Sequence, residues 1–216
     1  MKKNLTELVF ILARSGSMAG LEADTIGGFT AMLEKQKAEP GEAIVSTVLF
    51  ANRTEVLHDR QPLARVPAMP RENYRVRGCA ALLAAVGGAI RHIGNVHKYA
   101  REEDRPERTL IIITTDDMEN ARRRYDYREV KAMIEQMREK YGWEFLFLGA
   151  NIDAAREAAR FGIRADRAAN YHADHRGTEG IYSAVSEAGT AFRAARPLAD
   201  DWRRSIDSDF DSRDRH

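Results

Sequence analysis

Three stretches of the chain are almost continuously apolar, and each leads directly into polar residues. They cover Glu7–Ala13, Arg108–Thr115 and Trp143–Leu148. Strands of a parallel sheet are covered by helices on both faces, so their sequences are unbroken apolar runs rather than alternating ones. We therefore expect these three runs to form buried strands of one sheet.

Between and after these runs, apolar residues recur near the helical spacing. Side chains three or four positions apart lie on one face of a helix, as Val130 and Ile134 do in one of these segments. Pro40-Gly41 ends the first such pattern. Helices are predicted over Leu21–Lys37, Ala80–Ile93, Tyr127–Tyr141, Ile152–Phe161 and Thr178–Ala195.

Two further segments have the composition of strands. The β-branched stretch Ala43–Phe50 is followed, after Ala51-Asn52, by Arg53–His58. A connection this short is typical of an antiparallel hairpin, so we expect the second segment at an edge of the sheet. One more short strand is predicted near Ala165–Tyr171.

The order of these elements predicts the fold class. Strands and helices alternate, which is typical of a doubly wound α/β fold. We expect a mostly parallel central sheet with one antiparallel edge strand and helices on both faces. A length of 216 residues suits a single domain, which we place at residues 1–196. Residues 197–216 are rich in Asp, Arg and Ser, and we expect a partly disordered tail that frays or lies on the surface.

The composition argues against several kinds of partner. The formal net charge is +1 with both signs interspersed, so a broad cationic surface for nucleic acid is not expected. Met1–Asn4 lead into an apolar run that is too short for a signal peptide or a membrane helix. We expect a cytoplasmic protein with no nucleic-acid or membrane partner. The single cysteine, Cys79, cannot form an internal disulfide, and we expect a small buried residue rather than a catalytic thiol.

Polar residues that follow the apolar runs are the first candidates for a site. Ser15 and Ser17 follow the first run, and Asp116 and Asp117 follow the run that ends at Thr115. Gly78-Cys79-Ala80 precedes the second helix. Ligands of open α/β sheets bind outside the carboxyl ends of the strands, so we expect these loops to form the binding edge.

These loops carry a resemblance to a known family. Ala13-Arg14-Ser15-Gly16-Ser17 resembles the Asp-x-Ser-x-Ser motif of von Willebrand factor type A domains, and Thr114-Thr115-Asp116 is similar to the family's later Asp motif, usually followed by Gly. Gly78-Cys79-Ala80 falls where the family has a metal-binding Thr. The resemblance covers about residues 5–170 in element order. It implies the family's fold and a Mg²⁺ site completed by a carboxylate of a protein partner.

The same comparison predicts that most of the metal ligands are lost. Ala13 stands in place of the first Asp and Ala80 in place of the Thr, which leaves Ser15, Ser17 and Asp116 as the residual metal ligands. Ala51 and Ala84 stand where related bacterial members often have Asp. Two hydroxyls and one carboxylate compensate poorly for the dehydration of a hard cation. We therefore expect no bound cofactor. These alanines are compatible with natural degeneration and with deliberate substitution.

Two alternatives for these residues stay open. Asp117 stands where Gly is usual, and as a substitute ligand it would place a second carboxylate beside Asp116. Weak Mg²⁺ binding through Ser15, Ser17, Asp116 and Asp117 would then allow recognition of an acidic residue of a partner. Alternatively, Ser15 and Ser17 cap the following helix or bond to the loop backbone.

The remaining candidates carry no assigned role. His92 and His97 are five positions apart, which does not align them on one helical face, and they are expected at the surface or at a helix end. His172 and His175 flank Asp174 in a predicted loop. The glycine patterns of dinucleotide sites, P-loops and nucleophile elbows are absent from the sequence after the first run. Our main hypothesis is a non-enzymatic protein-interaction module with an inactive metal site; an α/β enzyme with an unrecognised site is the second alternative.

Overall fold

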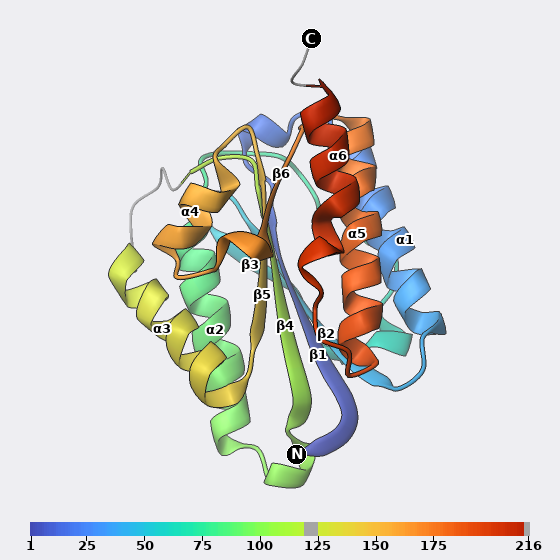
Figure 1. The fold of residues 1–216 in the computed structure, drawn as a ribbon, viewed down its shortest axis with the longest axis vertical. Helices are drawn as coiled ribbons and strands as arrows, with labels where there is room; N and C mark the ends of the chain where they lie inside the picture. The colour runs from blue at the N-terminus through green and yellow to red at the C-terminus, as the bar shows by residue number, and fades with distance from the viewer. Residues whose placement is uncertain (119–124, 214–216) are drawn as a thin grey trace.

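The computed structural model describes residues 1–118 and 125–213, in which six strands form one twisted sheet (Figure 1). The strand order is β3-β2-β1-β4-β5-β6, and β3 pairs with β2 in the antiparallel sense while the other neighbours are parallel. The predicted fold class is therefore confirmed. The strands are β1 (Lys2–Ala13), β2 (Glu42–Phe50), β3 (Thr54–Pro62), β4 (Pro106–Thr115), β5 (Glu144–Ala150) and β6 (Ala168–Tyr171).

Helices cover both faces of the sheet (Figure 1). Phe10 and Leu12 of β1 pack with Phe29 on one face, whereas Val9 and Ile11 pack on the other face with residues such as Val86. This alternation follows from the two-residue period of a strand. The first face is covered by α1 (Glu22–Ala38), α5 (His175–Arg193) and α6 (Arg204–Arg213), and the second by α2 (Leu82–Tyr99), α3 (Tyr127–Tyr141) and α4 (Ala154–Arg160).

Most predicted elements occur, with shifted ends. β1 begins at Lys2, because Lys2 still pairs with Pro106 of β4 beyond an irregularity in the register. β3 continues to Pro62 rather than ending at His58, since an edge strand needs no unbroken apolar run. Helix α2 extends to Tyr99, six residues beyond the predicted end at Ile93. The predicted bounds of α3 are those observed.

The C-terminal segment differs from the expected frayed tail. Leu198, Trp202 and Ile206 are buried, and they recur at a spacing of four that a sequence rich in Asp and Arg obscures. A short 3-10 turn, Asp200–Arg203, leads into α6, which contacts β6 and α5. Residues 198–213 therefore belong to the packed domain, while 214–216 lie outside the described residues.

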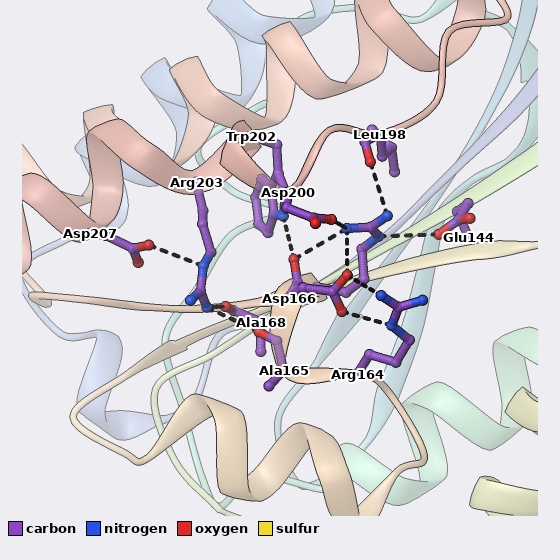
Figure 2. A network of polar contacts seen from close by, with 11 residues as sticks. Glu144, Arg164, Ala165, Asp166, Ala168, Leu198, Asp200, Trp202, Arg203 and Asp207 are labelled. Carbon is purple, nitrogen blue, oxygen red and sulfur yellow. Dashed lines mark hydrogen bonds and ion pairs between the residues drawn. The ribbon is translucent and has the colours of Figure 1, made fainter.

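A polar network fixes this segment to the loop before β6 (Figure 2). The indole Nε1 of Trp202 donates to the carbonyl of Asp166 over 2.8 Å, and the Asp166 carboxylate pairs with Arg164 and Arg167. Arg203 donates to the carbonyl oxygens of Ala165 and Ala168. Buried apolar side chains and satisfied backbone carbonyls together explain why this charged stretch is ordered.

Within the described part of the chain, no helix is both long enough and apolar enough to cross a membrane.

Candidate functional site

The structure brings Ser15 and Asp116 together at the carboxyl ends of neighbouring strands. Leu12 of β1 pairs with Thr114 of β4, so the two following loops start side by side. The Ser15 hydroxyl donates to Oδ1 of Asp116 over 2.8 Å, and both residues are buried. Ser15 is therefore not a helix-capping side chain here; it begins a 3-10 turn without a side-chain cap bond.

The carboxyl group of Asp116 is held in an unfavourable environment for a charge. Burial raises its pKa, the Asp117 carboxylate adds to this, and hydrogen bonding by the Ser17 and Ser15 hydroxyls opposes it. Ser17 itself is exposed. The second carboxylate oxygen, Oδ2, is buried without a hydrogen-bond partner among the described residues. A buried acceptor of this kind costs free energy until water or a ligand satisfies it.

The positions at which the sequence predicts lost metal ligands are apolar and closed to solvent. Ala13 is 2% exposed and Ala80 is 0% exposed, and both belong to the hydrophobic cluster under α2. Ala51 is also buried, and Ala84 is half-buried on the first turn of α2. None of these side chains carries an oxygen, so the motif positions supply two hydroxyls and one carboxylate. This set fits Mg²⁺ poorly, because the ion takes about six oxygens in near-octahedral geometry.

Asp117 is already engaged in local turn contacts. Its Oδ1 accepts the backbone N–H of Met118 over 2.8 Å, and its carbonyl accepts the hydroxyl of Thr115 over 2.7 Å. Residues 119–124, which follow directly, lie outside the described residues. No group of three or more His, Cys, Asp or Glu in the described ranges could hold a metal ion.

The sequence analysis missed a buried arginine at this edge. Arg14 is 2% exposed; its Nη2 contacts Glu55 of β3 over 2.5 Å and its Nη1 donates to the carbonyl of Asn73 over 2.8 Å. Arg14 therefore ties the end of β1 to the hairpin and to the loop before α2. The only signal in the sequence was a charged residue between the apolar run and the Ser-Gly-Ser segment.

The loop of residues 66–81 contains no helix or strand but is firmly attached to the domain. Its Tyr74 is 1% exposed and donates to the carbonyl of Ala13, while the N–H of Arg77 donates to the carbonyl of Arg14 over 2.9 Å. At Gly78 the φ angle is +68°, and a Cβ there would meet Cγ of Asn52 at 3.1 Å. Loops of this length without secondary structure are uncommon and usually functional.

Two arginines of this loop project beside a surface hollow of about 470 Å³. Arg71 and Arg75 line it together with Tyr74, and neither arginine forms an ion pair with another described residue. The carboxylate on the rim, Glu22, accepts the N–H of Gly20 over 2.8 Å. The loop carries Arg71, Arg75 and Arg77 against one acid, Glu72, so this loop has excess positive charge.

The remaining candidates lie only in part where the sequence predicted them. Cys79 is exposed rather than buried, because Gly78 turns the chain outward before α2 begins. His97 lies in the last turn of α2, as expected, and in addition its Nε2 contacts Oε2 of the fully buried Glu7 over 2.5 Å. His92 pairs with Asp59 at the surface. His172 stacks on Phe210 and His175 pairs with Asp24, so the two histidines have separate protein partners.

No family model and no curated protein matches the sequence. Solved structures do match, and proximal thread matrix protein 1 of the mussel byssus superposes with a TM-score of 0.60 at 13% identity over 86% of this chain and 46% of that one. The chain has the von Willebrand factor type A fold.

Two further von Willebrand A structures have the same fold. The ArnB paralog VWA2 from Sulfolobus acidocaldarius gives a TM-score of 0.52 at 16% identity, over 85% of this chain and 44% of that one. A von Willebrand factor type A structure from Catenulispora acidiphila gives 0.56 at 14% identity, over 86% and 43%. The chain thus spans less than half the length of each of these three chains. Identities this low establish the von Willebrand A fold and leave the ligand to be argued from the site.

Proposed function

We propose that this chain is a non-enzymatic protein-interaction module of the von Willebrand A type, whose carboxyl edge binds an acidic segment of a partner protein without a metal ion. In this proposal the module works in the cytoplasm and needs no cofactor. Neither nucleic acid nor a membrane is its partner.

The observation that carries the proposal is the placement of charge at this edge. The carboxylate of Asp116 is buried and bonded to Ser15, whereas the guanidinium groups of Arg71 and Arg75 are exposed beside a hollow. An approaching carboxylate therefore meets guanidinium groups first. Guanidinium binds carboxylates through two parallel hydrogen bonds, which gives direct recognition without a bridging cation.

The attachment of the loop supports the same conclusion. Tyr74 is buried, Arg14 donates to the carbonyl of Asn73 before it, and the N–H of Arg77 after it donates to the carbonyl of Arg14. The backbone on both sides of Tyr74 is therefore fixed before a partner binds. Prior order lowers the entropic cost of association. Ala13 and Ala80 support the metal-free mode, because these buried alanines offer no oxygen to a cation.

A labelled oligoglutamate peptide tests the proposal in buffer containing EDTA. We expect salt-sensitive binding that Arg71→Glu/Arg75→Glu weakens by about tenfold or more. The matched control is Lys3→Glu/Arg196→Glu, which makes the same change in net charge at two exposed positions. Equal weakening by both double variants would show an effect of net charge alone and would overturn the proposal.

One observation favours the alternative of weak Mg²⁺ binding. Oδ2 of Asp116 is buried without a partner in the described residues, as expected of a ligand oxygen that awaits a cation. Ser15, Ser17 and Asp117 would then complete the protein's share of the coordination sphere. Asp116→Asn separates the two modes. If Arg71 and Arg75 bind the peptide, the variant binds oligoglutamate as the parent does. If a Mg²⁺ ion binds the peptide, Mg²⁺ increases the affinity of the parent and has no effect on the variant.

A further inference from the structure

A second candidate site lies at the opposite edge of the sheet. A cavity of about 750 Å³ opens between the C-terminal halves of α2 and α3, next to the amino ends of β4 and β5. Small-molecule sites typically occupy about 300–1,000 Å³. The cavity shares no lining residue with the loops that carry Ser15, Asp116 and Arg71, so it stands independently of the function proposed above.

One wall of the cavity is apolar and adaptable. Trp143 lines the cavity together with Met133 and Met137 of α3. Helices α2 and α3 approach closely at Gly94, where a Cβ would meet Cε of Met137 at 3.1 Å. An indole ring with flexible thioether side chains suits the flat or flexible hydrocarbon part of a ligand.

A buried ion pair fixes a polar group at the same cavity. His97 lines it, and its Nε2 contacts the Glu7 carboxylate over 2.5 Å, while Nε of Arg60 donates to the other Glu7 oxygen over 2.8 Å. Glu7 is 0% exposed. The imidazole ring also packs edge-on against Trp143, with 5.3 Å between the ring centroids.

The position of His97 is therefore determined from two sides. A fully buried carboxylate is costly unless it is paired, and the pairing here leaves the imidazole oriented before any ligand arrives. Nδ1 of His97 has no partner among the described residues. With Nε2 donating to Glu7, Nδ1 can accept a hydrogen bond from a hydroxyl or N–H group of a ligand.

The rim of the cavity is positively charged. Arg91, Lys98 and Lys140 are exposed there, without an ion pair to any described residue. The two acids of the lining are engaged, since Glu107 accepts the N–H of Asn4 and Glu102 faces the N-terminal amino group. Lys98 and Lys140 also complement the C-terminal ends of their helix dipoles. Arg91 stands about two turns before the end of α2, so the dipole does not account for it.

We propose that this cavity binds a small organic anion with an aromatic or aliphatic body. The body lies against Trp143 and Met137, and the carboxylate or sulfonate of the ligand faces Arg91, Lys98 and Lys140 of the rim. Binding needs both parts of the ligand, because the wall supplies the apolar contact and the rim selects the charge.

Two matched dyes test the proposal on the full chain. Anilinonaphthalene sulfonate has an apolar body and an anionic group, and phenylnaphthylamine has nearly the same body without the charge. We expect saturable one-to-one binding of the sulfonate, at least about tenfold tighter than that of the uncharged dye. Lys98→Glu/Lys140→Glu should remove that difference, whereas Arg71→Glu/Arg75→Glu, at the other edge, should preserve it.

Cavity filling provides a test that does not depend on charge. Asn95→Trp places a large side chain in the lining and should abolish binding of both dyes. Near-ultraviolet circular dichroism tests whether each variant is folded and so excludes dye bound to a loosened core. If Lys98→Glu/Lys140→Glu does not fold, Lys98→Gln/Lys140→Gln replaces it, and the same loss of preference for the sulfonate dye is expected. Equal affinity for the two dyes, or unchanged sulfonate binding in the lysine variant, would overturn the proposal.

Discussion

The hydroxyl of Ser15 donates to Oδ1 of Asp116 over 2.8 Å, although 101 positions separate the two residues in the sequence. The pairing of β1 with β4 brings them together, and the contact leaves only Oδ2 of the carboxylate unbonded among the described residues. Next to this pair, Ala13 and Ala80 provide no side-chain oxygen. The behaviour of the edge toward cations follows from this arrangement.

We expect millimolar Mg²⁺ to leave the thermal stability of the chain unchanged. Ala13→Asp together with Ala80→Thr should restore cation-dependent stabilisation of ~1 kcal/mol once Mg²⁺ exceeds its Kd a few times. The measurement is thermal unfolding with Mg²⁺ and with EDTA, backed by calorimetric titration. The control is Ala13→Asn together with Ala80→Val, which adds side chains of nearly the same volume without the carboxylate charge or the Thr hydroxyl.

Either of two results would contradict this prediction. Calorimetric Mg²⁺ binding by the unchanged chain would mean that Asp117 completes the site despite its contact with the N–H of Met118. Absence of binding after restoration, with the fold intact, would mean that Ala13 and Ala80 do not occupy the ligand positions.

Replacing Ile112 by Asp should destabilise the domain by about 3 kcal/mol or more, because it buries an unpaired charge in a central strand. Ile112 is 1% exposed and lies opposite Phe10 of β1 and Leu146 of β5 in the sheet. Urea unfolding measures the effect. Ile112→Val, which removes one methylene, should cost only about 1 kcal/mol. A midpoint for the Asp variant near that of the Val variant would argue against a buried β4.

Trp202→Ala should cost about 3 kcal/mol or more in the free energy of unfolding, because it leaves a cavity where the C-terminal segment meets the core. Trp202→Phe keeps most of the apolar contact and loses the hydrogen bond to Asp166, so it should cost about 1–2 kcal/mol. If the Ala variant unfolds at the same urea concentration as the parent, residues 198–213 do not pack on the domain in solution.

The ionisation of Asp174 should make the free energy of unfolding depend on pH in the acidic range. A hydrogen bond from Arg213 is the main cause that lowers its pKa, and the N–H of Gly177 contributes. Because the folded pKa lies below the ordinary value of about 4, the stabilisation is complete above that value and is lost as the pH falls through the folded pKa.

Asp174→Asn tests this and preserves the helix cap, since Asn also accepts from the N–H of residue 177. The gap in unfolding free energy between parent and variant should be widest near neutral pH and should close on acidification. Arg213→Gln should flatten the pH dependence in the same way, because it removes the principal donor. A gap that stayed constant down to pH values of about 2 would show that Asp174 has no lowered pKa.

Local signals in the sequence were sufficient for several elements. Helix α3 has its predicted bounds, and Asp126 and Glu129 form a capping box at its start, so its limits depend on residues within the element. The buried strands were predictable because their apolar runs are unbroken. The packing of the C-terminal segment was not predictable, because it depends on only three apolar residues, Leu198, Trp202 and Ile206, which stand among many charged ones.

Long-range pairs were beyond such reasoning. Arg14 reaches Glu55 because the sheet places β3 only two strands away from β1, within the length of an arginine side chain. His97 reaches Glu7 because the end of α2 packs over β1. The sequence around Arg14 or His97 does not indicate which acidic residue each one contacts. A charged residue next to an apolar run is ordinarily exposed to solvent. The approach of Ser15 to Asp116 was foreseeable in outline, because the carboxyl ends of parallel strands share one edge of the sheet.

The position of α6 also affects how molecules of this chain meet one another. β6 is the last strand of the sheet and only four residues long, and Arg203 occupies the carbonyl oxygen of Ala168 at its start. Unprotected outer strands recruit strands of other molecules, which leads to aggregation. With α6 in contact with β6, and His172 stacked on Phe210 at the far end, this side of the sheet is closed to strand addition. The C-terminal segment therefore covers the β6 edge, and we expect cleavage before Leu198 to expose this strand and to promote self-association.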